Sequence, residues 1–215
     1  MWMWIGLLLL GAYHGLNPAM GWLFAVALGM QEKNGKAIAE SLLPLGLGHL
    51  ASVAVVVGAA ELATVTLPLR TIRIMAGVIL IGYAFYKLLR RRHPRWVGMR
   101  VGAKDLALWS FLMASAHGAG LMLLPFVLVH SAPAMPAEHQ HHIALASTIA
   151  PPSGMMIEWW LSVGLHTLGY LAATALAALL VYYKLGVAVL RKAWFNFDWL
   201  WVAALLASGI LTLVA

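Results

Sequence analysis

The chain contains no cysteine and little charge. Its 215 residues include only seven Asp or Glu and 14 Lys or Arg, so charged residues make up 10% of the sequence, against roughly a quarter in soluble domains. The absence of cysteine excludes disulfides, thiolate metal ligands and thiol redox chemistry. The scarcity of charge, together with 63% hydrophobic residues, excludes a soluble globular domain and indicates an integral membrane protein.

The hydrophobic runs predict an all-α protein with six transmembrane helices, at about residues 3–30, 37–60, 70–90, 105–129, 155–183 and 194–215. Each run approaches or exceeds the ~20 apolar residues that cross a bilayer. The first and fifth are long enough to be tilted, kinked or partly re-entrant. The opening MWMWIGLLLL lacks a basic segment and a cleavage site, so we expect a retained helix. Too little polar sequence is left for a soluble domain, and residues 1–215 form one transmembrane domain.

The net charge of +7 does not indicate nucleic-acid binding, because the basic residues flank the apolar runs. Twelve of the 14 Lys and Arg residues fall in the segments 31–36, 87–104 and 184–192, and only Arg70 and Arg73 fall on the opposite side. Cytoplasmic loops of membrane proteins carry the excess of Lys and Arg. We therefore expect a multi-pass protein of the inner (plasma) membrane with both termini, and the loop 130–154, outside.

Two halves of the sequence resemble each other. AYHG (12–15) in the first run corresponds to SAHG (115–118) in the fourth, and GLGHL (46–50) in the second to VGLHT (163–167) in the fifth. Each half holds three predicted helices, an odd number, so the second half enters the membrane from the opposite side. The pattern predicts two inverted three-helix repeats, about 1–90 and 105–215, an architecture frequent in transporters.

Four histidines share one predicted depth. His14, His49, His117 and His166 each lie about 11 or 12 residues into a different run, which is roughly 17 Å along a helix and near the middle of a core about 30 Å thick. Ionisable residues at that depth are a functional hypothesis by default. We predict that these four residues are metal ligands, because imidazole binds transition-metal ions well. The alternative is that each histidine bonds to a neighbouring helix.

The stretch GAYHGLNPAMG (11–21) predicts a helix break next to the first of these histidines. Pro18 interrupts the hydrogen-bond ladder, and Asn17 with the carbonyls freed by Pro18 offers oxygen ligands. The second half offers Gly118, Gly120 and Pro125 as its break. The predicted substrate pathway therefore comprises Gly15, Asn17, Pro18 and Gly118.

The loop at 130–154 is rich in histidine. His130, His139, His141 and His142 form a short tract of the kind that binds metals, and we interpret it as a metal-capture loop on the outer side. The alternative is a Pro/Ala-rich linker that happens to contain histidine.

Three functions compete on this pattern. The first is transport of a divalent transition-metal cation, as substrate, by alternating access. The second is proton-coupled export of a small organic solute such as an amino acid. The third is electron transfer by a bis-histidine haem. A membrane metallohydrolase is disfavoured because the runs lack Asp or Glu at the histidine depth, so we predict no enzyme and no tightly bound cofactor.

The expected partners are the lipid bilayer and a metal ion or small solute, without nucleic acid. The small-residue face AATALAAL (172–179) is compatible with a homodimer.

With these features the chain resembles the LysE/DsbD superfamily of six-span membrane proteins with three-plus-three inverted repeats. The stretch HGLNP is most similar to the nickel/cobalt transporter and HupE/UreJ-like branches, which carry a short His-Gly-x-Asn/Asp-Pro motif. The resemblance implies a transporter but does not carry over completely. Nickel transporters follow that histidine with an Asp-His pair, which is absent here, and DsbD-like members carry paired cysteines where this chain has His14 and His117.

Overall fold

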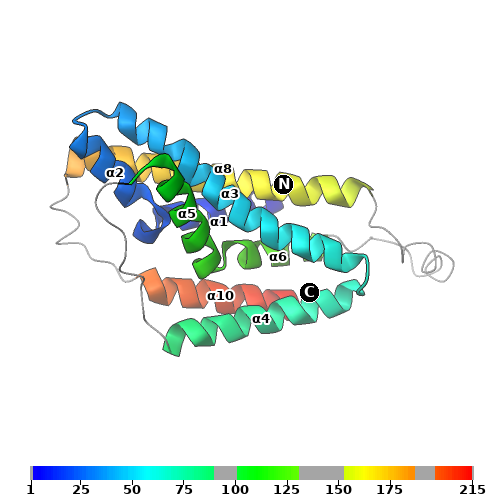
Figure 1. The fold of residues 1–215 in the computed structure, drawn as a ribbon. Coiled ribbons are helices and arrows are strands. Elements are labelled where there is room, and N and C mark those ends of the chain that lie inside the picture. Colours follow the sequence, from blue (N-terminus) through cyan, green and yellow to red (C-terminus); the bar gives the residue numbers. More distant parts are fainter. Residues whose placement is uncertain (1, 90–100, 131–152, 187–196, 215) are drawn as a thin grey trace.

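The computed structural model describes residues 2–89, 101–130, 153–186 and 197–214. The elements are α1 (Trp2–Leu16), the 3₁₀ turn η1 (Pro18–Met20), α2 (Trp22–Gln31), α3 (Lys36–Thr64), α4 (Leu69–Leu89), α5 (Ala103–His117), α6 (Ala119–His130), α8 (Ser153–Leu180), the π-helical turn η3 (Val181–Leu185) and α10 (Phe197–Val214). All of these elements are helical (Figure 1), so the predicted all-α class is confirmed for the described part of the chain.

Several helices are long and apolar enough to cross a membrane. Three of them, α3, α4 and α8 with its π-helical end, meet this criterion singly. A fourth crossing results if α5 and α6 are taken together across the 59° bend between them, whereas α1, α2 and α10 are shorter. The six predicted ranges all coincide with helices, but six crossings and the inverted repeat stay predictions.

Many large apolar side chains are exposed on the surface of the bundle, while several polar side chains are buried among the apolar residues of its interior. Leu62 is 72% exposed and Leu43 69%, while His14 and His49 are fully buried. In water, exposed leucine and buried histidine side chains are unfavourable. In the hydrocarbon of a bilayer, by contrast, leucine is stable on the surface and polar groups are stable only in the interior. The distribution is that of a membrane protein.

Two helix breaks interrupt the bundle. The first separates α1 from α2, where Asn17 has extended backbone angles, Pro18 begins η1, and Gly21 has φ +122°. The second separates α5 from α6 at Gly118, which has φ +70°. Both glycines occupy backbone conformations that side chains disfavour. The predicted breaks at HGLNP and Gly118 are confirmed, but Pro125 lies inside α6 and does not end a helix.

The helices pack in two layers. In Figure 1, α4 and α10 lie side by side as one layer, while α1, α2, α3 and α8 form the other; α6 lies between the layers and α5 packs along α3. The main contacts join α1 to α8, α3 to α5 and α4 to α10, and α3 also packs on α8.

Glycine allows the closest of these approaches. A Cβ at Gly11 of α1 would overlap the carbonyl oxygen of His166 on α8, and a Cβ at Gly48 of α3 would overlap the carbonyl oxygen of Ala107 on α5. The backbones of these helix pairs are therefore in direct contact. Side chains that flank Gly11 on α1 therefore lie close to α8, and side chains that flank Gly48 on α3 lie close to α5.

The ends of the helices separate into two groups. The turn between α2 and α3 and the end of α8 lie at one end of the bundle, and the turn between α3 and α4 lies at the opposite end, together with the marked ends of the chain (Figure 1). The first group contains Lys33, Lys36 and Lys184, and the second precedes Arg70 and Arg73. This grouping agrees with the predicted charge asymmetry, while the assignment of one end to the outside stays a prediction.

Candidate functional site

Three of the four predicted histidines meet in the interior of the bundle. His14 comes from α1, His49 from α3 and His166 from α8, and all three have no exposed surface. The ring centroids are 4.9 Å apart for His14 and His166, 5.3 Å for His49 and His166, and 5.9 Å for His14 and His49. We call these residues the three-histidine cluster.

The nitrogens of this cluster are largely unpaired. His14 Nδ1 lies 2.9 Å from the carbonyl oxygen of Leu10, one turn earlier in α1, and its Nε2 is buried without a partner. Both ring nitrogens of His49 are also buried without a partner. The ring of His166 lies near the Leu7 carbonyl, but neither nitrogen makes a hydrogen bond of good geometry. Unsatisfied buried polar groups are costly and rare, so these five nitrogens need an explanation.

The separations of the three rings are compatible with a shared ion, but the orientation of the rings is not. A tetrahedral ion with metal–nitrogen distances of about 2.1 Å places imidazole centroids roughly 5 Å apart, and the observed separations are 4.9–5.9 Å. In the described residues, however, no group of three or more His, Cys, Asp or Glu side chains is arranged to hold a metal ion. Rotation of the rings about their side-chain bonds is needed before the nitrogens can converge.

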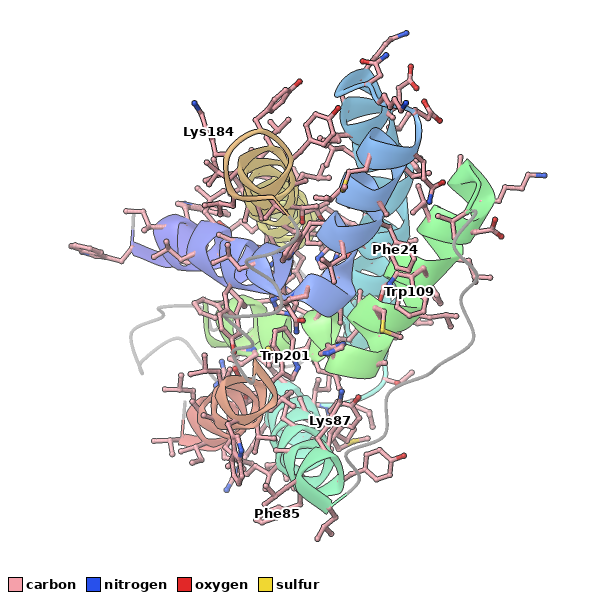
Figure 2. The ribbon with its side chains drawn as sticks, turned by 90° about the vertical axis from the view of Figure 1, so that its left-hand side faces the viewer. Phe24, Phe85, Lys87, Trp109, Lys184 and Trp201 are labelled. Atoms are coloured by element: carbon pink, nitrogen blue, oxygen red, sulfur yellow. The ribbon has the colours of Figure 1, made fainter. Side chains whose placement is uncertain are left out.

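The fourth predicted ligand, His117, is tied to the cluster through a tryptophan. Its Nδ1 lies 2.8 Å from the carbonyl oxygen of Met113, the same one-turn contact that His14 makes with Leu10. The indole of Trp201 on α10 contacts both histidines edge-on, with centroid distances of 4.5 Å to His14 and 5.0 Å to His117. Figure 2 shows Trp201 on the side of α10 that faces the other helices.

Side chains from distant parts of the chain occupy the carbonyls that the first break frees. Trp109 Nε1 of α5 donates to Ala19 O at 3.0 Å, and the Tyr170 hydroxyl of α8 donates to Met20 O at 2.7 Å. Figure 2 shows Trp109 beside Phe24 of α2, with which its ring is in contact. The freed carbonyls are thus held by hydrogen bonds within the protein.

The predicted pathway residues have structural roles in the breaks. Asn17 Oδ1 accepts a hydrogen bond of 3.0 Å from the Ala19 N–H and so caps η1, which Pro18 begins. Gly15 packs against the backbone of Tyr170, and Gly118 ends α5. The structure places all four residues at the breaks, but it gives Asn17 a capping bond in place of the free oxygen ligand that we expected.

The predicted metal-capture loop lies outside the described residues. His139, His141 and His142 belong to the range 131–152, and His130 ends α6 with a side chain that is not described. Their role stays a prediction.

Two aromatic residues of the site were missed by the sequence reasoning. Tyr170 stacks on His49 with a centroid distance of 3.9 Å and an interplanar angle of 6°. Trp201 stacks on Tyr13 at 5.2 Å and covers His14. Tyr170 follows His166 by four residues, which places both on the same face of a helix. This spacing could have predicted that Tyr170 lies at the site. Nothing in the sequence singles out Trp201 among ten tryptophans.

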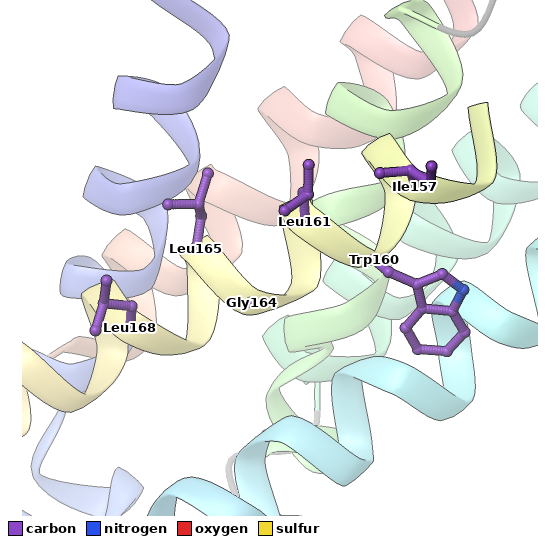
Figure 3. Close-up of a pocket in the computed structure, with 6 residues that line it drawn as sticks. All are labelled: Ile157, Trp160, Leu161, Gly164, Leu165 and Leu168. Atoms are coloured by element: carbon purple, nitrogen blue, oxygen red, sulfur yellow. The ribbon is translucent and has the colours of Figure 1, made fainter. Parts of the chain in front are cut away.

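A shallow groove of about 660 Å³ lies away from the cluster, along the outer face of α8 (Figure 3). It is lined by Ile157, Trp160, Leu161, Gly164, Leu165 and Leu168. These side chains are apolar apart from the indole N–H, and most are strongly exposed. The groove is therefore a lipid-facing surface, and the chemistry-bearing groups lie on the inward face of the same helix.

No protein-family model matches the chain, and comparisons with curated proteins and with solved structures give no significant match. The resemblance to the LysE/DsbD superfamily therefore stays a prediction.

Proposed function

We propose that the protein is a membrane transporter of a divalent transition-metal cation, which passes through the three-histidine cluster. One observation carries the proposal. Three fully buried imidazoles from three different helices lie with their centroids 4.9–5.9 Å apart, and most of their nitrogens have no hydrogen-bond partner.

The unpaired nitrogens argue against a purely structural role. A histidine that joins two helices would donate to, or accept from, the neighbouring helix. His49 does neither with its ring nitrogens, although it is fully buried. A passing ion supplies the missing partner, because each neutral imidazole offers one lone pair to a metal.

The size of the cluster favours an ion over an organic solute. The three rings are within contact distance of one another, so the space between them suits a single ion better than an amino acid. An exporter of organic solutes would need the helices to separate much further at this depth.

The ligand type favours a borderline metal. Imidazole suits Zn²⁺, Ni²⁺, Cu²⁺ and Co²⁺, whereas Mg²⁺, Ca²⁺ and Mn²⁺ prefer carboxylate oxygens. The cluster consists of neutral rings, with Tyr170 and Trp201 as further aromatic neighbours. Without a carboxylate among the three ligands, the ion's charge is poorly compensated, and the resulting weak binding suits transport better than storage.

The hydrogen bond of His14 prepares it for this role. Metal-binding histidines commonly donate their other ring N–H to a carbonyl or carboxylate, which fixes the tautomer. The contact of Nδ1 with Leu10 O assigns the proton to Nδ1 and leaves the lone pair on the buried Nε2.

An inverted repeat gives this site a transport mechanism. Each half contains one broken helix, α1–α2 or α5–α6, and a histidine near the end of its first segment contacts the carbonyl one turn earlier. In the proposed repeat, α1 of the first half corresponds to α5 of the second, and α3 corresponds to α8. The contact of α1 with α8 therefore has a counterpart in the contact of α5 with α3, and both contacts are present. Rocking of the halves around a midplane site would expose it to each side in turn. The orientation with both termini outside the plasma membrane belongs to the same proposal.

Cobalt titration of the detergent-purified protein tests the proposal, because tetrahedral Co²⁺ bound to nitrogen has a visible spectrum. We expect about one Co²⁺ per chain in the wild type and loss of the visible band in His49→Ala. The matched control is Ser208→Ala, a buried polar residue of α10 outside the cluster, which should bind as the wild type does. A wild type that binds no Co²⁺, or that shows a haem spectrum as purified, would overturn the proposal.

A further inference from the structure

Trp201 makes four contacts that no other described side chain combines. Its ring stacks on Tyr13 at 5.2 Å and meets His14 and His117 edge-on, while its Nε1 donates to the carbonyl oxygen of His117 at 2.6 Å. The side chain is 1% exposed. One residue thus covers a member of the three-histidine cluster and holds the break between α5 and α6.

The hydrogen bond to His117 O belongs to a pair that fixes this break. The His117 carbonyl is among those that the end of α5 leaves without an intrahelical partner. The preceding carbonyl, that of Ala116, accepts a hydrogen bond from the Tyr83 hydroxyl of α4. Leu205 and Tyr83 also pack against Gly118. Two adjacent helices, α4 and α10, therefore hold the break through one donor each.

We propose that Trp201 is a positioning residue that closes the three-histidine cluster on the side of α10. An ion enters or leaves on this side only when the hydrogen bond from Trp201 Nε1 to His117 O breaks. This inference rests on the proposed function, because it names how access to the same site is controlled. The layer of α4 and α10 is then the element that moves. Because Trp201 contacts the His14 ring, movement of this layer changes how the ring is covered.

The proposal has a kinetic consequence that a merely structural role lacks. Loss of one buried hydrogen bond shifts an equilibrium by about tenfold, so Trp201→Phe should favour the open state while keeping an aromatic ring against His14. A gate changes the barrier in both directions, and the rates of ion association and dissociation should therefore rise together. Distortion of the ligands would instead weaken affinity mainly through faster dissociation.

Stopped-flow measurements with Co²⁺ separate these cases. We expect both rate constants to rise about tenfold in Trp201→Phe, with a Kd close to that of the wild type. Tyr83→Phe removes the companion bond without touching His14, and a smaller increase of both rates is expected. Trp199→Phe, on the same helix but 55% exposed, is the matched control and should leave both rates unchanged. Unchanged rates in Trp201→Phe, or a weaker Kd through dissociation alone, would overturn the gate.

A second measurement does not depend on metal binding. Because the chain lacks cysteine, Ser110→Cys places a single thiol beside the cluster, where Ser110 donates to Leu45 O at 2.7 Å and lies 3.3 Å from the Tyr170 hydroxyl. Maleimide reacts with the thiolate and so requires access of water. We expect about tenfold faster labelling when Trp201→Phe is added, and no change with Trp199→Phe.

The two measurements distinguish failure of the gate from failure of the proposed function. If the wild type binds no Co²⁺ but Trp201→Phe accelerates labelling, the gate stands and the cation proposal falls. If labelling is unchanged while the melting temperature shows a folded protein, the gate is wrong whatever the cluster binds.

Discussion

Replacement of Gly11 by alanine should separate the helices that carry His14 and His166. A Cβ at this position would overlap His166 O and lie 2.9 Å from both the His166 carbonyl carbon and the Tyr170 nitrogen, all backbone atoms of α8. Ordinary van der Waals contact begins near 3.4 Å. Since the backbone of α8 cannot rotate away as a side chain would, the two helices must move apart.

The cost can be estimated against a matched glycine. Overpacking of this kind costs about 1–3 kcal/mol, while an alanine in place of a helical glycine stabilises by roughly 0.5–1 kcal/mol. Gly164, on α8 near His166, is exposed and has nothing within 4 Å of its Cβ position, so Gly164→Ala should show the gain alone. The gain from alanine is common to both variants, so we expect Gly11→Ala to unfold at a temperature about 2–12 °C below that of Gly164→Ala, at about 2–4 °C per kcal/mol.

Thermal unfolding in detergent, followed by circular dichroism, measures this difference. The same variants should differ in Co²⁺ binding, because the separation of α1 from α8 moves His14 away from His166. If Gly11→Ala melts at or above Gly164→Ala, the close contact between α1 and α8 is wrong, and the arrangement of the cluster is wrong with it.

Three further predictions concern the breaks and the ligands. Tyr170→Phe leaves Met20 O without its donor and should destabilise the protein by about 1–3 kcal/mol in thermal unfolding; an unchanged melting temperature would contradict the role of this bond. Asn17→Ala removes the cap of η1 and should cost about 1 kcal/mol, whereas stoichiometric Co²⁺ binding should persist, and its loss would make Asn17 a ligand. Zn²⁺ affinity should fall at acidic pH, because protons compete for the imidazole lone pairs, and an affinity that stays constant down to about pH 3 would contradict histidine ligation.

The helices and the two breaks could be predicted because their signals are local. Apolar runs reveal helices, and HGLNP combines a proline that lacks an N–H with nearby glycines. The break predicted at Pro125 is absent because a proline inside an apolar helix can be accommodated by neighbouring groups, and α6 continues through it. Gly118, with its positive φ, makes the break instead.

The composition of the cluster could be predicted only in part because residue counting gives depth but not direction. Equal depth brought His14, His49 and His166 together correctly, but it could not show that Trp201 would contact both His14 and His117. We expected carbonyls of the break at Pro18 to face an ion, but those of Ala19 and Met20 face protein side chains. These carbonyls are occupied by Trp109 and Tyr170, 90 and 150 residues away in the sequence, and no local pattern reveals such contacts.

Zn²⁺ uptake into proteoliposomes tests the central claim most directly. The variants are His14→Ala, His49→Ala and His166→Ala, with His117→Ala for comparison and Ser208→Ala as the control outside the cluster. The account predicts Zn²⁺ uptake by the wild type and by Ser208→Ala. Each cluster variant removes one of the three ligands, so its rate of uptake should fall by at least about tenfold. The rate should fall less in His117→Ala. Uptake that survives substitution of all three cluster histidines, or a wild type that carries no Zn²⁺, would contradict the account.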